Sequence, residues 1–288
     1  MPRTAPQPIP YQGSKRHQLR HLLRYVPAST ATLWDAFAGS GAFTLGIAAQ
    51  GLGDRYVLTD TLAPLMGIWQ AILADPEPLA AAYADHWQRQ QRDPRTYYDA
   101  VRRAFNAEHQ PTDLLYLLAR CVKSAVRFNQ QGEFNQSADH RRLGARPDAM
   151  RSRLLAAHRL LRGHATAEVA DYACALAAAR PADLVYLDPP YLGTTTGRDR
   201  RYHQGLDLPR FLTALHEANE RDVSYLVSFD GQTGGRSYGS PLPEHLGLRR
   251  VDIPVGRSSQ ATLLGRDERT VEALYVSPAL QRRLPNPG

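Results

Sequence analysis

Residues 184–191 read LVYLDPPY, an apolar run that ends in an acid and two prolines. Because proline has no N–H and a fixed φ angle, this pattern is typical of a buried strand that stops abruptly at Asp188. In open α/β sheets, ligands bind beyond the carboxyl ends of such strands. We therefore expect Asp188, Pro189, Pro190 and Tyr191 to lie at a ligand-binding edge of a sheet.

These four residues suit the chemistry of an exocyclic amine on a nucleobase. Such an amine is a poor nucleophile because its lone pair is delocalised into the ring. The Asp188 carboxylate and a proline carbonyl can accept its two N–H hydrogens and direct the lone pair at an electrophile, while Tyr191 stacks on the base. The alternative is a strand end with an ordinary Pro-Pro turn, and four residues alone do not decide between the two.

The composition limits the class of protein. With 288 residues, of which 43% are hydrophobic, the chain can bury one large core or one core plus an inserted module. The net charge of +7 suits a polyanionic partner, although it also occurs in chains that bind none. Cys121 and Cys174 are isolated, so we expect no disulfide scaffold and no metal site. No apolar run is long enough to span a bilayer, and we expect a cytoplasmic chain without a membrane partner.

A second pattern predicts the start of a Rossmann-like sheet. Residues 32–41 read TLWDAFAGSG and precede an apolar-periodic segment, as expected for a strand, a tight glycine turn and a helix. The turn is neither a P-loop nor a complete dinucleotide fingerprint. Residues 56–60 predict a second strand that ends in Asp60, where a carboxylate can reach ribose hydroxyls. A glycine turn and a ribose acid without a phosphate loop indicate S-adenosylmethionine (AdoMet) rather than NAD; a nucleotide-free turn is the alternative.

Residues 10–16, PYQGSKR, lead into a predicted helix with Ser14 as its candidate N-cap. Tyr11 and Lys15 then lie beside a helix N-terminus, which suits an anionic group of a ligand. An ordinary capped surface helix is the alternative. The remaining pattern predicts a helix at 206–220 and strands at 165–169, 224–229, 251–255 and 271–276.

The βα alternation is interrupted between about residues 76 and 162. Apolar residues at helical spacing predict a helical insertion there, with a small core of its own. Residues 127–146 are irregular and rich in arginine and amide side chains, which pair with base edges or phosphates. A polar, glycine-containing segment at 192–205 predicts a loop that closes over a base and its phosphates.

Taken in order, these segments resemble the Dam-type (D12 class) DNA adenine-N6 methyltransferases. The matching positions are Tyr11 to Lys15, Asp35-x-Phe37-x-Gly39-x-Gly41, Asp60, residues 188–191, and the accompanying segments 97–98, 127–129, 132–135, 202–203 and 257–259. In the first of these, Ser14 stands where the family usually has a second glycine.

The resemblance implies an α/β fold, a Rossmann-like seven-stranded AdoMet-dependent methyltransferase sheet with an inserted helical target recognition domain. Residues 1–75 and 163–288 would form the catalytic domain, and residues 76–162 the insertion. The implied activity is site-specific transfer of the AdoMet methyl group to N6 of a flipped-out adenine in double-stranded DNA. Methylation of cytosine N4, RNA or a protein glutamine, and an inactive DNA-binding relative, are the alternatives.

The resemblance also implies roles for individual residues. The catalytic residues would be Asp188, Pro189, Pro190 and Tyr191. AdoMet would contact Tyr11, Lys15, Asp35, Phe37, Gly39, Gly41, Asp60, Asp171, Tyr172 and Asp188, with Asp60 on the ribose and Tyr11 and Lys15 near the methionine end. DNA would contact Arg127, Asn129, Gln130, Asn135, Arg141, Arg142, Tyr202 and His203. Double-stranded DNA is the implied partner, and a cognate restriction endonuclease for the same site is a second candidate.

Overall fold

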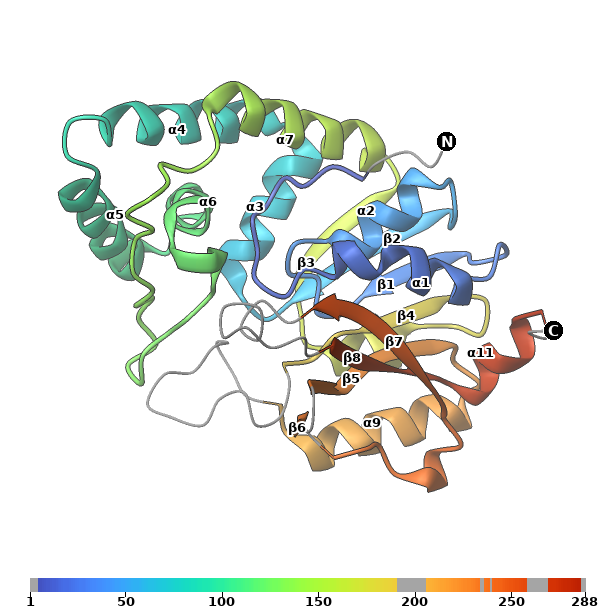
Figure 1. The fold of residues 1–288 in the computed structure, drawn as a ribbon. Helices are drawn as coiled ribbons and strands as arrows, with labels where there is room; N and C mark the ends of the chain where they lie inside the picture. Colours follow the sequence, from blue (N-terminus) through green and yellow to red (C-terminus); the bar gives the residue numbers. More distant parts are fainter. Residues whose placement is uncertain (1–4, 191–205, 234–235, 239, 258–268, 286–288) are drawn as a thin grey trace.

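Seven strands form one mixed sheet in the order β3-β2-β1-β4-β5-β8-β7, and a short strand, β6, pairs with β5 (Figure 1). The computed structural model describes residues 5–190, 206–233, 236–238, 240–257 and 269–285. Strands β1 to β5 are parallel, and β6, β7 and β8 are antiparallel to their neighbours. The strands are β1 (Thr32–Asp35), β2 (Arg55–Asp60), β3 (Ala165–Val169), β4 (Leu184–Leu187), β5 (Tyr225–Thr233), β6 (Arg236–Tyr238), β7 (Arg249–Arg257) and β8 (Arg269–Val276). This architecture confirms the predicted Rossmann-like sheet.

Helices cover both faces of the sheet. They are α1 (Leu19–Leu22), α2 (Ala42–Ala49), α3 (Ala63–Ala74), α4 (Pro76–Arg89), α5 (Pro94–Glu108), α6 (Pro111–Arg120), α7 (Pro147–Leu161), α8 (Tyr172–Ala178), α9 (Leu208–Glu220) and α11 (Pro278–Arg283), with 3-10 turns η1 (Lys15–Gln18), η2 (Leu23–Tyr25), η3 (Val122–Ser124) and η4 (Glu244–Leu246). One face packs against α2 and α3, and the other against α8 and α9 (Figure 1). Because both faces are covered, every residue of β4 is buried.

The turn between β1 and α2 holds the backbone close to the sheet edge. Gly39 and Gly41 have φ angles of 48° and 60°, in the left-handed region that favours glycine. The Ala38 N–H donates to the Thr59 carbonyl over 2.9 Å, which ties the turn to β2. The buried Trp69 of α3 donates from Nε1 to the Gly39 carbonyl over 3.0 Å. The turn is therefore held by hydrogen bonds from two neighbouring elements.

The inserted helices α4, α5, α6 and α7 lie together at one end of the molecule (Figure 1). Their buried residues, Tyr98, Phe105 and Leu114 among them, belong to the same continuous hydrophobic cluster as Leu33 and Trp69. The expectation of a separate small core is therefore wrong, because α6 packs directly on α3 and α7 packs on both α2 and α3. The division of the chain into two domains at about residues 75 and 163 stays a prediction.

The predicted strands and the helix at 206–220 are confirmed. Helices α3, α8 and α11 were not anticipated. The helix expected after Ser14 consists of one short α segment between two 3-10 turns. Ser14 occupies the N-cap position with φ −54°, so it needs no glycine, but its side chain makes no capping hydrogen bond. Its Oγ instead accepts a hydrogen bond from the Ser40 hydroxyl over 3.1 Å.

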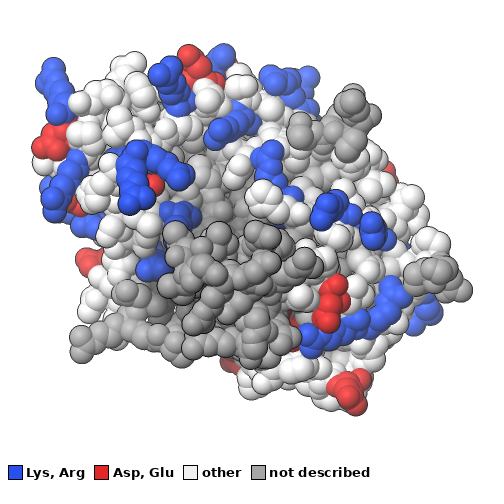
Figure 2. Space-filling model, in the orientation of Figure 1, with Lys and Arg blue, Asp and Glu red and all other residues white. Residues whose placement is uncertain are grey.

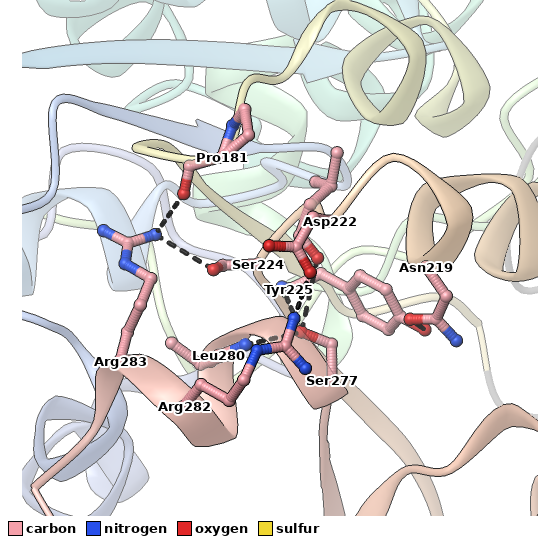
Figure 3. Close-up of polar contacts among 10 residues, drawn as sticks. Pro181, Asn219, Asp222, Ser224, Tyr225, Ser277, Leu280, Arg282 and Arg283 are labelled. Carbon is pink, nitrogen blue, oxygen red and sulfur yellow. Dashed lines mark hydrogen bonds and ion pairs between the residues drawn. The ribbon is translucent and has the colours of Figure 1, made fainter.

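Helix α11 is fastened to the edge of the sheet where the parallel strands begin (Figure 3). The Arg283 guanidinium donates, over 2.6–3.3 Å, to Ser224 Oγ and to the carbonyl oxygens of Ser29, Pro181, Ala182 and Asp183. These acceptors lie within the three residues that precede β1, β4 and β5. Next to it, Arg282 makes a single ion pair with Asp222, in which both side chains are exposed. One guanidinium therefore joins three strand starts to the C-terminal helix.

Replacing Arg283 by methionine should lower the free energy of unfolding by about 2–3 kcal/mol, because several charge-assisted hydrogen bonds are lost at once. Arg282→Met is the matched control, and we expect it to cost about 0.5 kcal/mol or less, as is usual for an exposed ion pair. Urea unfolding of both variants measures the difference. Equal losses for the two arginines would contradict this role of Arg283.

Candidate active site

A pocket opens at the carboxyl ends of β1, β2 and β4, the edge where a ligand was expected. It is lined by residues 11–15, by most of residues 35–43, by residues 60–62, by Tyr186 and residues 188–190, and by Val126 of the insertion. Nine predicted site residues lie among the lining residues: Tyr11, Lys15, Asp35, Phe37, Gly39, Asp60, Asp188, Pro189 and Pro190. Gly41 supports the turn behind the pocket, while Tyr191, Tyr202 and His203 lie outside the described residues.

Lys15 links the first segment of the pocket to the end of β4. Its Nζ lies 3.2 Å from Asp188 Oδ1 and 2.7 Å from Glu272 Oε2 of β8. The Lys15 side chain is only 6% exposed, and the two carboxylates are 19% and 17% exposed. A single ammonium therefore lies between two shielded carboxylates, one of which is the acid of the predicted catalytic segment.

Burial determines the protonation behaviour of two acids in the pocket. It raises the pKa of Asp188 to about 6, although the Lys15 ammonium opposes this shift and the Glu272 carboxylate adds to it. Burial also raises the pKa of Asp35 to about 7, against the hydrogen bond that Thr44 Oγ1 donates to Asp35 Oδ2 over 2.8 Å. The charges of Asp188 and Asp60 add to the shift at Asp35. The pocket is thus an environment in which additional negative charge is unfavourable.

Asp60 stabilises the glycine turn as well as facing the pocket. Its Oδ2 accepts a hydrogen bond from the Gly39 N–H over 3.3 Å, and its Oδ1 accepts one from the Leu62 N–H over 3.0 Å. Both bonds hold the Asp60 carboxylate at the edge of the pocket, beside the glycine turn. Tyr11 covers the same turn, since a Cβ at Gly39 would lie 3.2 Å from its ring.

A second pocket adjoins the first on the α8 and α9 side, and both are lined by Phe37, Thr61 and Pro190. The Phe37 and Tyr172 rings stack there with centroids 5.5 Å apart. Asp171 begins α8 by accepting the Ala173 N–H over 2.7 Å, and its other oxygen pairs with Arg210 of α9 over 2.7 Å. The structure therefore places Asp171 and Tyr172 with Phe37 in the lining of this second pocket, where two aromatic rings are stacked.

The predicted DNA-contacting residues of the insertion lie on the loop after η3. The Asn135 N–H donates to the Arg127 carbonyl over 3.0 Å, and Phe128 and Phe134 form a bridge, so this part folds as a small hairpin. Gln130 at its tip is exposed. The Asn129 side chain is hydrogen-bonded within the hairpin tip, where its Oδ1 accepts hydrogen bonds from the backbone N–H groups of Gln131 and Glu133 over 2.9–3.0 Å.

Arg141 and Arg142 are exposed on the next part of the loop. The buried Arg120 holds the backbone here by donating to the carbonyls of Asp139 and Arg142. The Gln12 N–H donates to the Ser124 carbonyl over 2.9 Å, which ties the start of this region to the pocket wall. The two parts of the predicted site are therefore physically connected.

Sequence reasoning missed Glu272, Gln18 and Thr44. Glu272 lies on the same side of β8 as the buried Leu274 and Val276. A single charged residue within the otherwise apolar run 271–276 was the signal that could have identified it.

Among the described residues, no group of His, Cys, Asp and Glu side chains is arranged to hold a metal ion. Within the same part of the chain, every helix is too short or too polar to cross a membrane.

Comparisons with known proteins give one consistent match. The model of the D12 class N6 adenine-specific DNA methyltransferases matches residues 11–230. A DNA N-6-adenine-methyltransferase of Escherichia phage P1 is 25% identical over 231 residues, which cover 77% of this chain but only 29% of the phage protein. The retron Ec67 DNA adenine methylase of Escherichia coli is 27% identical over 88% of each chain. A type II methyltransferase of Lactococcus lactis subsp. cremoris is 22% identical over 82% of each.

Proposed function

The chain belongs to the D12 class of N6 adenine-specific DNA methyltransferases, and from this premise we propose that it transfers the methyl group of AdoMet to N6 of an adenine flipped out of double-stranded DNA. The observation that carries the proposal is the position of Asp188, at a strand end and in the same pocket as the glycine turn and Asp60. The family match favours adenine N6 over cytosine N4, an RNA base or a protein glutamine as the methylated group.

The residues of the pocket fit AdoMet. Among the described lining residues, three are carboxylic acids, Asp35, Asp60 and Asp188, and one is a cation, Lys15. This balance suits a ligand with a sulfonium and an ammonium group better than one with phosphates. Asp60 would bind the ribose hydroxyls, and Phe37 with Tyr172 offers flat surfaces for the adenine ring. Tyr11 and Lys15 would lie near the methionine end.

AdoMet, when bound, supplies an electrophilic methyl group on a sulfonium. The protein's contribution is orientation of the amine: Asp188 and a proline carbonyl of residues 189–190 accept the two N6 hydrogens of the target adenine. This removes the amine lone pair from conjugation and directs it at the methyl group. Tyr191 would stack on the base.

DNA would contact the pocket side of the insertion. Basic side chains are common on the face of the molecule that Figure 2 shows, including the part formed by the inserted helices. We propose that Arg127, Gln130, Asn135, Arg141 and Arg142 contact DNA, with the exposed arginines suited to phosphates. Asn129 would have to leave its hydrogen bonds within the tip in order to read a base.

The proposed function is tested with purified protein, radiolabelled AdoMet and duplex DNA, followed by nucleoside analysis of the product. We expect label in N6-methyladenine, and sequencing of the methylated DNA would then give the recognition site. Label in N4-methylcytosine would move the activity to another base, and no label in any DNA, RNA or protein substrate would favour an inactive DNA-binding relative.

A further inference from the structure

We propose that Glu272 is a positioning residue for methyl transfer, which holds the Lys15 ammonium so that an oxygen of Asp188 stays available to accept an N6 hydrogen. The inference deepens the proposed function and rests on it. Glu272 lies outside residues 11–230, the part of the chain that matches the family model, whereas Lys15 and Asp188 lie inside it.

The distances support a division of labour between the two carboxylates. Lys15 Nζ is closer to Glu272 Oε2, at 2.7 Å, than to Asp188 Oδ1, at 3.2 Å. The same Glu272 oxygen accepts a second hydrogen bond, from Gln18 Nε2, over 2.7 Å. Glu272 is therefore the stronger partner of the ammonium. Gln18 and Lys15 both belong to η1, so Glu272 also anchors the turn that carries Lys15.

The sheet directs the Glu272 side chain toward this site. Strand β8 lies between β5 and β7, so the backbone of Glu272 is paired on both sides, with Gly231 and with Ile253. The register on β5 shifts between Phe229 and Gly231, which leaves Asp230 as an extra residue with φ 27°. Irregularities of this kind often re-aim a side chain beside a functional site.

Charge balance gives the physical reason. If Lys15 faced Asp188 alone, a shielded ammonium and a shielded carboxylate would form a tight pair, and Lys15 would compete with the adenine amine for the Asp188 oxygens. The Glu272 carboxylate balances the charge of the Lys15 ammonium and holds it closer to itself than to Asp188. Among the described residues, the titratable and charged groups around Asp188 are Lys15 of η1, Glu272 of β8 and Tyr186 of β4, with Asp35 and Asp60 in the same pocket.

The pH dependence of the single-turnover rate, at saturating AdoMet and DNA, tests this role. The rate should fall as the pH drops and Asp188 becomes protonated, because a protonated carboxyl group is a poorer acceptor. In Glu272→Gln the loss of a neighbouring negative charge lowers the pKa of Asp188. The low-pH part of the pH–rate profile, where the rate falls (the acid limb), should therefore move to lower pH by roughly 1 unit. The plateau rate should fall about tenfold, which is the equivalent of one hydrogen bond, because the Lys15 ammonium then pairs with the Asp188 carboxylate and competes with the adenine amine for its oxygens.

Two further variants make the test specific. Lys15→Met removes a positive charge beside Asp188, so its acid limb should move in the opposite direction, to higher pH. Asp252→Asn neutralises an exposed carboxylate on the neighbouring strand β7, 61% exposed and paired with Arg250, and should leave the limb in place. A limb that does not move in Glu272→Gln, or moves upward, would overturn the proposal, since a purely structural role would lower the rate equally at every pH.

Direct titration separates failure of this proposal from failure of the proposed function. The side-chain carboxyl carbon of Asp188 is followed by NMR in protein labelled with carbon-13 at aspartate, and Asp188→Asn assigns the signal. A lower Asp188 pKa in Glu272→Gln shows that Glu272 acts on Asp188 even if wild-type protein methylates no adenine, an outcome that would reject only the proposed function; together with the lower plateau rate it supports the positioning role. An unchanged or higher pKa overturns the positioning role whatever the activity.

Discussion

Replacing Asp188 by alanine is expected to lower methyl transfer by about 10³-fold, while the affinity for DNA changes by less than about threefold. The size of the loss follows from the proposed role of Asp188 as a preorganised acceptor for the reacting amine, since removal of such a group usually costs factors of about 10²–10³. DNA affinity depends mainly on phosphate and base contacts made elsewhere on the protein. Single-turnover methylation and fluorescence anisotropy with labelled duplex measure the two quantities.

Folding stability provides the control for Asp188→Ala. The pKa of Asp188 is raised to about 6 in the folded protein, so ionisation of this group opposes folding above about pH 6 and has no such effect below about pH 4. At pH 7.5 the alanine variant should therefore be no less stable than the wild type, since Lys15 keeps Glu272 as a partner. Comparable losses of turnover and DNA affinity would count against the catalytic role, and a large loss of stability would indicate a structural one.

Replacing Gly41 by alanine is expected to destabilise the protein by about 3–4 kcal/mol and to abolish AdoMet binding at micromolar concentrations. A Cβ at Gly41 would lie 2.4 Å from Trp69 Cζ2, too close for the structure to tolerate without a shift. Trp69 is fully buried and held by its hydrogen bond to the Gly39 carbonyl, so its ring has little room to move. Overpacking contributes about 1–3 kcal/mol and the left-handed backbone about 1–2 kcal/mol.

Gly51→Ala separates these two contributions. Gly51 also has a positive φ, 71°, but a Cβ there would meet nothing within 4 Å. Its replacement should therefore cost only the backbone part, about 1–2 kcal/mol, and leave AdoMet binding intact. Chemical denaturation and isothermal titration calorimetry give both values for each variant. If the two substitutions were equally destabilising, Trp69 would not restrict the turn.

Local patterns were sufficient for most of the sheet. Strand β4 was predicted because its four residues are apolar and an acid and two prolines follow, and β1 because a glycine turn follows it. Helix α3 was missed because apolar residues surround much of its circumference, so its amphipathic period is weak. Helices α8 and α11 have only seven and six residues, too few for a clear period.

The site divides in the same way. The sequence by itself placed the three acidic candidates at strand ends, since Asp35, Asp60 and Asp188 each directly end a predicted strand or follow one, and the structure brings all three to one pocket. It also determined the family, because the order of these segments along the chain is specific. Only the tertiary structure decided that Glu272 and Gln18 join them and that the insertion shares the core of the sheet.

The physical reason is the distance along the chain over which each signal acts. A strand end or a glycine turn depends on the torsion preferences of a few adjacent residues, so a short stretch of sequence is enough to predict it. The Lys15 ammonium meets Asp188 and Glu272 only because parallel strands bring their carboxyl ends to one edge and β8 inserts between β5 and β7. That meeting depends on the packing of the whole sheet.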